Sequence, residues 1–435
     1  MFSPLYTADE MHAAEQGHDV DAMMERAGRA VADAVLRRYP DARRIAGVCG
    51  KGANGGDGRI ALRVLAEAGR ETSEDLDGAD VVIDALFGTG FHGAPRDDAA
   101  ELIEAINTWD APVVAVDLPS GIDASTGEIA GAAVTADVTV TMHAAKVGLA
   151  VAPGRFHVGD VEVADIGIDA GETTHRLVTD DVLELVPRKG AGATKYSSGS
   201  VLVVGGSPGM SGAVCLAARA AFRADAGYVA VATHEETLPI VEMLVLEAVK
   251  APFADVDRLA RRATAVALGP GLGRGEDERA LVRRLLRELE VPAVVDADAL
   301  FGLEPDDWPG PRVLTPHAGE LAHLLERDDV DAHRLDAVQA AADRFGCVVL
   351  LKGADTLVAA PGEGVLVSAA GTPALATAGT GDVLTGIVAA FLAKGIEPRL
   401  AAAGAAFAHG RAAQLGPERG FVASDLIEAL PDVLP

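Results

Sequence analysis

Glycine-rich loops follow the apolar segments of this 435-residue sequence, and they hold the side chains that could do chemistry. The first loop, residues 50–58, carries Asn54 and Asp57 among its glycines. Gly55 and Gly56 would allow positive φ and close backbone approach, and the helix expected from about Arg59 would attract an anion to its N-terminus. The loop therefore predicts a phosphate-type site with extra oxygen ligands. A merely structural tight turn is the alternative.

Two later loops of the N-terminal part also carry polar groups. Residues 84–93 contain the spacing G-x-G-x-x-G, but this loop does not follow the first strand. The pattern alone is weak, so we interpret it as a cradle for one phosphate or a ribose-phosphate. Because parallel strands end at one edge of a sheet, we expect Asp84, Asp117 and Ser120 to meet Asn54 there. Such oxygen groups suit a monovalent or hard cation as well as a sugar, and helix capping is the alternative for the two carboxylates.

The sharpest motif of the C-terminal part is Gly-Thr-Gly-Asp, which ends at Asp382 before a helix expected over residues 383–394. N–H groups at that helix start could hold a phosphoryl group in transfer, and Asp382 could take a proton from an attacking hydroxyl. Lys352, expected at a strand end, could neutralise phosphate charge. A helix-dipole partner is the alternative for Asp382, and His317 is open between a capping or core role and a substrate contact. No Walker A motif occurs.

Apolar runs of strand length alternate with helical segments along the whole chain. Near-continuous hydrophobicity predicts strands buried on both faces of parallel sheets that helices flank, hence an α/β fold. An alternating run at residues 161–166 is expected at a sheet edge. Residues 169–199 are rich in Gly, Thr and Asp and mark a junction, so we expect domains 1–170 and 171–435. The other expected strands are 45–49, 81–86, 112–116, 137–142, 200–204, 228–233, 263–268, 292–295, 312–315, 347–352 and 356–359.

Composition excludes several classes of protein. The chain has 65 acidic and 37 basic residues, a formal net charge of -28, which disfavours nucleic-acid binding. A hydrophobic content of 49% is too high for a disordered acidic chain, so we expect a folded protein with an acidic surface suited to high salt. An ordinary acidic cytosolic protein is the alternative. Three cysteines, no secretory signal and no apolar run of membrane-spanning length predict a cytoplasmic protein without a membrane partner.

Taken together, the motifs identify a family. The sequence resembles the bifunctional NAD(P)H-hydrate repair enzymes, in which an NAD(P)H-hydrate epimerase domain is fused to an ADP-dependent (S)-NAD(P)H-hydrate dehydratase domain. The resemblance covers nearly the whole chain and is specific because many motifs occur in the same order. They lie at residues 24–28, 54–58, 84–90, 117–121, 146–149, 195–199, 205–207, 269–273, 296–300, 314–317, 351–353 and 379–384.

The resemblance implies a fold and a site for each domain. The epimerase domain, 1–170, is expected to be a Rossmann-like three-layer α/β/α sandwich, and the dehydratase domain, 171–435, a ribokinase-like one. The residues implied for the hydrate in the first domain are Ala53, Asn54, Gly55, Gly56, Asp57, Gly88, Thr89, Gly90, Phe91, His92, Gly93, Ala94 and Asp117. Those implied in the second domain are Ala213, Gly271, Gly273, His317 and Asp382 for the hydrate, and Lys352, Gly353, Ala354, Asp355, Thr356 and Gly381 for ADP.

The resemblance also implies the chemistry. Asp117 is expected to act as acid and base in epimerising the R and S hydrates, and Asn54, Asp84 and Ser120 to hold K⁺. Asp382 is expected to act as base when the S hydrate (NADHX or NADPHX) is phosphorylated by ADP, with Mg²⁺, before phosphate is lost. The sequence departs from the family pattern at Ala53, where an Asn is usual, and around residues 70–77, where a surface loop is short. A homo-oligomer is expected.

Two other functions stay open on the sequence. Gly-Thr-Gly-Asp alone also fits a ribokinase-like small-molecule kinase with a fused regulatory domain. The N-terminal part could instead be a binding or scaffold module, although Asn54, Asp57, Asp84 and Asp117 are all present. The sequence does not distinguish NADHX from NADPHX as substrate, or ADP from ATP as strict cosubstrate.

Overall fold

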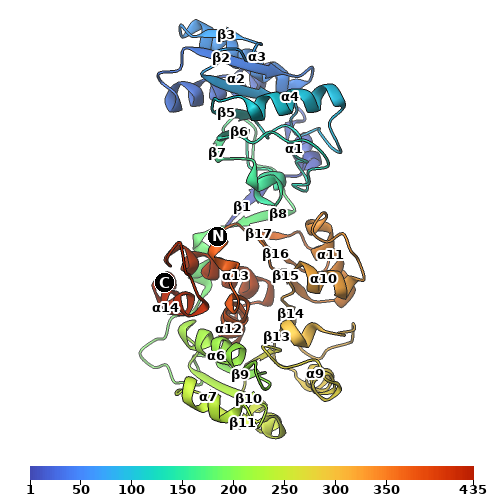
Figure 1. The fold of residues 1–435 in the computed structure, drawn as a ribbon, viewed down its shortest axis with the longest axis vertical. Coiled ribbons are helices and arrows are strands. Elements are labelled where there is room, and N and C mark those ends of the chain that lie inside the picture. Colours follow the sequence, from blue (N-terminus) through green and yellow to red (C-terminus); the bar gives the residue numbers. More distant parts are fainter. The chain divides into compact units, whose positions relative to one another are not determined.

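A computed structural model describes residues 1–435, and the chain divides into two compact units. One unit is Pro4–Arg176, and the other combines Met1–Ser3 with Leu177–Pro435. Each unit is built on its own β-sheet with helices on both faces (Figure 1). The expected α/β class with two three-layer domains is confirmed.

The first unit has a six-stranded sheet in the order β3-β2-β4-β5-β6-β7. Every neighbouring pair is parallel, so the strands end at one edge of the sheet. The edge strand β7 falls where the alternating run was expected. The strands are β2 (Arg44–Cys49), β3 (Glu71–Ser73), β4 (Val81–Ala85), β5 (Val113–Val116), β6 (Val138–Met142) and β7 (Asp160–Ala164).

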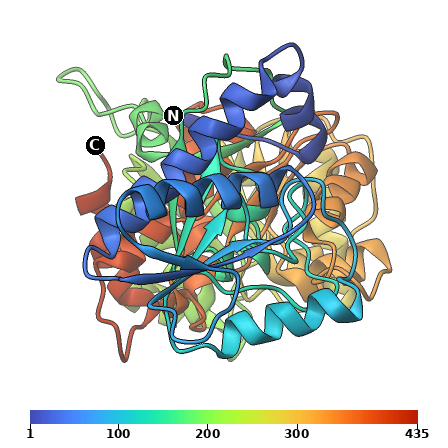
Figure 2. The same ribbon diagram turned by 90° about the horizontal axis from the view of Figure 1, so that it is seen from above.

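Alternate residues of these strands feed two separate cores. Ile83 and Val114 join the core under α2 (Val20–Arg38) and α3 (Ala53–Glu67), whereas Val82 and Ala115 join the core under α4 (Asp97–Thr108). Figure 2 shows α3 and α4 on opposite sides of these strands. The period of two in the strands therefore builds a three-layer sandwich. The short helices α1 (Ala8–Glu15) and α5 (Val147–Ala150) complete this unit.

The second unit has a sheet of eleven strands in the order β1-β8-β17-β16-β15-β14-β13-β12-β9-β10-β11. The strands from β15 to β11 in this order pair in parallel. The next strand, β16, is antiparallel to both of its neighbours, β15 and β17. The strands are β1 (Phe2–Leu5), β8 (His175–Val178), β9 (Ser200–Val204), β10 (Tyr228–Thr233), β11 (Val249–Pro252), β12 (Ala265–Leu268), β13 (Ala293–Val295), β14 (Arg312–Leu314), β15 (Val348–Leu351), β16 (Thr356–Ala359) and β17 (Leu366–Ser368).

One face of this sheet supports the helices that carry the candidate site. Helices α6 (Ser211–Arg223), α12 (Thr380–Ala393), α13 (Pro398–Gln414) and α14 (Ala423–Val433) share a core with inward residues of the central strands. Nearly every residue of α12 is buried, which agrees with its apolar sequence. The remaining helices are α7 (Leu238–Leu244), α8 (Val256–Ala260), α9 (Glu276–Glu288), α10 (Ala318–Leu325) and α11 (Arg334–Phe345). No helix combines the length and apolar character needed to cross a membrane.

Glycines let α12 lie close to its neighbours, and this closeness yields a stability test. A Cβ on Gly386 would lie 2.2 Å from the Ala217 carbonyl oxygen of α6, whereas a Cβ on Gly404 of α13 would meet nothing closer than 3.6 Å. We expect Gly386→Ala to destabilise the unit by roughly 1–3 kcal/mol through overpacking. Gly404→Ala should stabilise it by about 0.5–1 kcal/mol, because Ala favours helix. Urea unfolding measures both. Equal effects of the two variants would contradict this account of α12 packing.

Candidate active sites

A large cavity opens at the carboxyl edge of the first sheet. Its volume is about 1150 Å³, and three segments form most of its wall: the start of α3, the loop after β4 and residues of α1 and α2. Most of the residues predicted to bind the hydrate line it. They are Ala53, Asn54, Asp57, Gly88, Thr89, Gly90, Phe91, His92, Ala94 and Asp117. Gly55, Gly56 and Gly93 are not among the lining residues.

Helix α3 begins earlier than the sequence indicates. It starts at Ala53 rather than near Arg59, so Asn54 and Asp57 lie in its first two turns. Gly55 and Gly56 have no positive φ, which corrects that part of the expectation. They serve close packing instead: a Cβ on Gly55 would stand 1.9 Å from the Gly50 carbonyl oxygen, and one on Gly56 would stand 2.2 Å from Met24. The glycines therefore bring the start of α3 against the end of β2 and against α2, so that Ala53 and Asn54 line the cavity.

Asp117 is held by a buried lysine that the sequence did not single out as a site residue. Lys146 is fully buried, and its Nζ donates to Asp117 Oδ1 at 2.5 Å and to the Met142 carbonyl at 2.7 Å. Asp117 Oδ1 also accepts from the Thr141 hydroxyl and the Met142 N–H. Asp117 itself has φ 66, so the backbone turns sharply at the end of β5. All these contacts are to Oδ1, which leaves Oδ2 without an intramolecular partner. The sequence offered one signal for this role: Lys146 is a single lysine that follows the apolar segment of β6 (Val138–Met142).

The cavity concentrates carboxyl groups around this pair. Burial, together with the charges of Asp117 and Glu15, raises the pKa of Asp57 to about 7. Asp57 Oδ1 is buried without a partner. Glu15 of α1, which the sequence did not indicate, also lines the cavity, and its pKa is raised by burial and by Asp117. Near neutral pH, Asp57 is therefore divided between its neutral and charged forms, so it can either donate or accept a hydrogen bond there.

The three residues expected to hold K⁺ are joined by hydrogen bonds. Asp84 is fully buried and accepts from both the hydroxyl and the N–H of Ser120, at 2.6 and 2.7 Å. Phe87 links this pair to Asn54, because its N–H donates to Ser120 Oγ and its carbonyl accepts from Asn54 Nδ2. Burial raises the pKa of Asp84 to about 6. The set offers only hard oxygen ligands, so its chemistry fits an alkali cation.

The loop after β4 forms one wall of the cavity. Phe87 and Phe91 stack with ring centroids 4.6 Å apart, which fixes the shape of the loop between them. Gly93 has φ 76, where a side chain would be strained. The segment from Gly88 to Gly90, which lines the cavity, therefore lies between two stacked aromatic rings.

In the second unit, Asp382 lies in the first turn of α12. Gly379, the residue before this helix, has φ 91, which lets the loop enter the helix sharply. Thr380 donates its hydroxyl to Leu375 and Thr377 carbonyls, and its own carbonyl contacts His409 Nε2 at 2.9 Å. Burial lowers the pKa of His409 to about 4, so this histidine is neutral and structural. The loop that presents Asp382 is therefore held from both sides.

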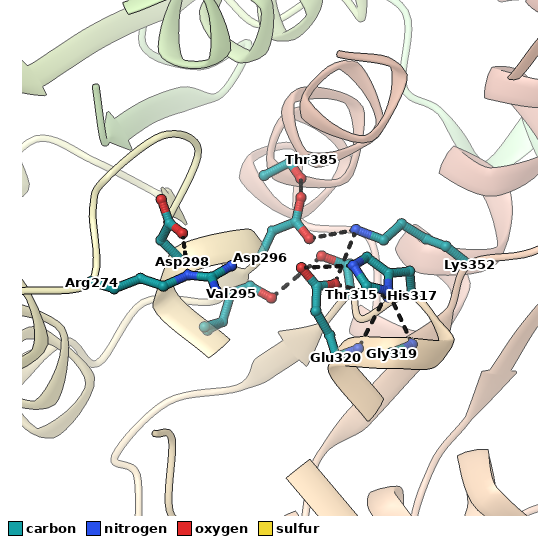
Figure 3. A network of polar contacts seen from close by, with 10 residues as sticks. All are labelled: Arg274, Val295, Asp296, Asp298, Thr315, His317, Gly319, Glu320, Lys352 and Thr385. Carbon is teal, nitrogen blue, oxygen red and sulfur yellow. Dashed lines mark hydrogen bonds and ion pairs between the residues drawn. The ribbon is translucent and has the colours of Figure 1, made fainter. Parts of the chain in front are cut away.

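A polar network lies next to this helix start. Lys352 Nζ donates to Asp296 Oδ1 at 2.7 Å and lies 3.7 Å from Glu320 Oε2. Thr385 of α12 donates to Asp296 Oδ2 at 2.5 Å, and Figure 3 shows Asp296 between Thr385 and Lys352. A Cβ on Gly381 would lie only 3.7 Å from Lys352 Nζ, so the ammonium group borders the expected anion hole. The sequence predicted Lys352 here but not its carboxylate partners.

Electrostatics differ for the two titratable groups beside this network. Burial raises the pKa of Asp382 to about 7; Asp296 and Asp298 add to this rise and Lys352 opposes it. Burial alone would lower the pKa of Lys352, but Asp296 and Glu320 outweigh burial and the net shift is upward. Lys352 therefore stays charged while Asp382 is poised near neutrality, which suits a general base.

His317 has the capping role that the sequence left open, and it also reaches solvent. Its Nδ1 accepts from the N–H groups of Gly319 and Glu320 at the start of α10, and its side chain is 60% exposed. Lys352 and His317 pair as an isolated β-bridge, so the ring stands close to the Lys352 backbone. The exposed edge of the ring is available to a ligand.

The loop predicted to bind ADP, residues 352–356, is anchored by a buried ion pair. Arg334 Nη1 donates to Asp355 Oδ1 at 2.6 Å, and its Nη2 donates to the Asp355 carbonyl. A Cβ on Gly353 would lie 2.3 Å from this guanidinium. The buried Asp355 therefore anchors the loop to Arg334, whereas Gly353 and Ala354 are exposed. Arg334 was not indicated by the sequence.

The remaining predicted residues form a neighbouring glycine turn. Gly271 and Gly273 have φ 58 and 95, and a Cβ on Gly271 would lie 3.1 Å from the Ala213 Cβ. The Gly273 N–H donates to Asp298, which also pairs with Arg274 at 2.7 Å. The structure thus brings Ala213 and Gly271 together, and it ties Gly273 to the strand end that also holds Asp296.

Fold and sites together define a protein of two α/β domains, the second of which is ribokinase-like. A family model described as NAD(P)H-hydrate dehydratase matches residues 201–434, and one described as YjeF-related protein N-terminus matches residues 20–73 and 68–148. Proteins named bifunctional NAD(P)H-hydrate repair enzyme Nnr are 38% identical in Moorella thermoacetica and 39% identical in Pyrobaculum aerophilum. Each alignment covers 95% of this chain, and 92% and 93% of the relatives.

Solved structures agree with the fold of the second unit. An ADP/ATP-dependent NAD(P)H-hydrate dehydratase from Bacillus subtilis, co-crystallised with ATP and Mg²⁺, is 29% identical with a TM-score of 0.55. The match covers 59% of this chain and 96% of that one. A ribokinase-like protein of Enterococcus faecalis has the same TM-score at 23% identity. The chain belongs to the family of bifunctional NAD(P)H-hydrate repair enzymes.

The buried pair of the first unit gives a testable consequence. Lys146→Met removes the only ammonium group that contacts Asp117 and leaves a buried carboxylate without its cation. Breaking such a pair costs about 3–5 kcal/mol, so we expect that loss in the free energy of unfolding of the first unit. Denaturant unfolding measures it. The double variant Lys146→Met/Asp117→Asn removes both charges and should recover most of the loss; no recovery would contradict the pair's role.

Proposed function

We propose that this chain repairs hydrated NADH and NADPH: its first unit epimerises the R and S hydrates, and its second unit dehydrates the S form with ADP. Membership of the family supports the two activities. The observation that carries the assignment to residues is Asp382, which lies at a helix N-terminus beside the Lys352 ammonium group. A base next to anion-binding groups is what phosphorylation of a hydroxyl requires.

Dehydration would proceed in two steps. Asp382 takes the proton of the C6 hydroxyl, whose oxygen attacks the β-phosphorus of ADP, and AMP leaves as the P–O bond to it breaks. Lys352 and the N–H groups around Gly381 would offset the charge on the phosphoryl oxygens. In the second step the C6–O bond breaks, phosphate departs and C5 loses a proton, so that the C5=C6 double bond forms again. The balance is hydrate plus ADP giving NAD(P)H, AMP and phosphate, with Mg²⁺ entering as part of the nucleotide substrate.

Epimerisation would use Asp117. The C6 hydroxyl of the hydrate stands beside the ring nitrogen, whose lone pair can assist departure of the oxygen as water. Protonation of that oxygen and deprotonation of the water that returns on the other face need one acid and base. Lys146 fixes Asp117 through Oδ1, so Oδ2 would be the atom that exchanges the proton. Asn54, Asp57 and the backbone from Gly88 to Ala94 would hold the nucleotide in the cavity.

Two variants test the division of labour. Asp382→Asn should slow ADP-dependent formation of NADH from the S hydrate by roughly 10²–10⁴-fold, because a general base is lost, and leave epimerisation intact. Asp117→Asn should slow conversion of R to S and leave dehydration of pure S hydrate unchanged. Recovery of absorbance at 340 nm follows dehydration, with ATP in place of ADP as a comparison, and chromatography follows the epimers. Normal repair by Asp382→Asn, or unchanged epimerisation by Asp117→Asn, would overturn the respective role.

K⁺ is proposed to bind at Asn54, Asp84 and Ser120 in the first unit. The support is their all-oxygen donor set and their shared hydrogen bonds through Phe87. Bound K⁺ would supply a fixed positive charge near the phosphate-binding loop. Exchange of K⁺ for tetramethylammonium, which is too large for the site, should slow epimerisation several-fold, and added K⁺ should restore it. Asp84→Asn should abolish this dependence on K⁺; a variant as K⁺-dependent as the parent would contradict the site.

A further inference from the structure

Asp296 occupies the centre of the second unit's polar network, and the reaction proposed above leaves it without a role. It follows β13 directly and is 1% exposed. Both carboxylate oxygens are used: Oδ1 accepts from the Lys352 ammonium at 2.7 Å, and Oδ2 accepts from the Thr385 hydroxyl at 2.5 Å (Figure 3). Burying a charged carboxylate costs desolvation free energy, which the ion pair with Lys352 and the hydrogen bond from Thr385 offset.

Both partners of Asp296 border Asp382. Thr385 stands three residues after Asp382 on α12, and its hydroxyl also contacts the Gly381 carbonyl at 3.1 Å. The Lys352 ammonium lies 3.7 Å from the place a Cβ would take on Gly381. Asp296 therefore joins the end of β13 to the ammonium group after β15 and to the first turn of α12. These are the groups that the proposed phosphoryl transfer uses.

We propose that Asp296 is a positioning residue for dehydration, which holds Lys352 and the first turn of α12 in place and sets the charge balance around Asp382. This inference rests on the dehydratase function proposed above. Asp296 does not touch the reacting atoms in this scheme. It acts through Lys352, whose long side chain it holds in one conformation, and through Thr385, whose hydrogen bond to Asp296 connects the first turns of α12 to the end of β13.

The titratable groups around Asp382 and Lys352 come from four elements. Asp296 and Asp298 lie after β13, Lys352 lies after β15, and the neutral His409 of α13 holds the Thr380 carbonyl. Glu320 of α10 acts on Lys352. Asp296 raises the pKa of Asp382 and Lys352 lowers it, beside the larger rise that burial causes. Removing either partner should therefore move the titration of Asp382, and in opposite directions.

The opposite effects of Asp296 and Lys352 on the pKa of Asp382 allow a role near Asp382 to be compared with a role in stability or ADP binding alone. If the pair of Asp296 and Lys352 only stabilised the fold, or Lys352 only bound ADP, replacing them would lower kcat or raise the KM for ADP. Those two readouts do not report the charges beside Asp382, whereas the pH at which Asp382 loses its proton does. The pH profile of dehydration is therefore the informative measurement, because the base works only when deprotonated and its acidic limb reports that pKa.

The experiment measures kcat/KM for the S hydrate against pH at saturating ADP, with the full chain. Asp296→Asn keeps the size and one acceptor oxygen but removes the charge, and it should shift the acidic limb to lower pH by about 1 unit. Lys352→Met should shift it to higher pH by a similar amount. Thr385→Val changes no charge, so it should lower kcat without moving the limb. Infrared titration of the carboxyl band that Asp382→Asn removes gives the same shifts without turnover.

The matched control is another lysine–aspartate pair on the same helix. Lys394 at the end of α12 pairs with Asp225 at 2.8 Å, about 18 Å along the helix from Asp382. Asp225→Asn should leave the pH profile unchanged. Should Asp296→Asn fail to fold, the shift in Lys352→Met decides the matter. An active parent whose profile moves in neither variant, or moves the same way in both, overturns the positioning role alone; an inactive parent overturns the proposed function.

Discussion

Each unit buries a carboxylate at the carboxyl edge of a parallel sheet, and each neutralises it with a lysine. In the first unit, Lys146 pairs with Asp117; in the second, Lys352 pairs with Asp296. A carboxylate removed from water without such a partner has a raised pKa, as Asp57 and Asp84 do, because desolvation disfavours its charged form. The paired lysine therefore allows a buried carboxylate to stay ionised at the sheet edge, where the loops that follow the parallel strands meet. The rest of each site is arranged around that pair.

Close packing brings loops and helix N-termini next to these lysine–carboxylate pairs. Parallel strands end together, so the loops after them already share an edge. The helix N-termini of α3 and α12 must then approach that edge closely enough to direct N–H groups at a ligand. In α3 a glycine makes this possible, because a Cβ on Gly55 would collide with the Gly50 carbonyl oxygen just after β2; in α12, Gly386 instead allows close packing against Ala217 of α6. Small residues in the helices thus determine how closely these helices pack.

The sequence predicts more of the fold than of the contacts in the sites. Buried strands such as β4, β9 and β15 are apolar throughout, so hydrophobicity finds them. Strands at or next to the sheet edges, such as β1, β8 and β11, are short and mixed in polarity, and pairing rather than composition creates them. Glycine loops pointed correctly to the edge of each sheet. At Gly55 and Gly56 the expected close approach is present but the expected positive φ is not, because both requirements select the same residue type.

The partners of the site residues were out of reach for a related reason. Asp296 was noted in the sequence as part of a motif, and Lys352 as a phosphate ligand, but 56 residues separate them. Only the parallel order β13-β14-β15 brings them together. The same holds for Arg334 and Asp355, where a helix residue supports a loop of the site from below. Pairs of this kind depend on topology, which one sequence without an alignment does not reveal.

The net charge of -28 at first conflicts with two sites for anionic nucleotides. Most acidic side chains are exposed, and many pair with arginines on the surface, as Glu276 does with Arg283. Salt screens such charges within about 10 Å, so they act weakly on a ligand inside a cavity. Lys352 and the helix N-termini lie at the sites themselves, where screening is weak and a short distance dominates. Local groups therefore determine what binds, whereas the acidic surface determines how the molecule interacts with its solvent.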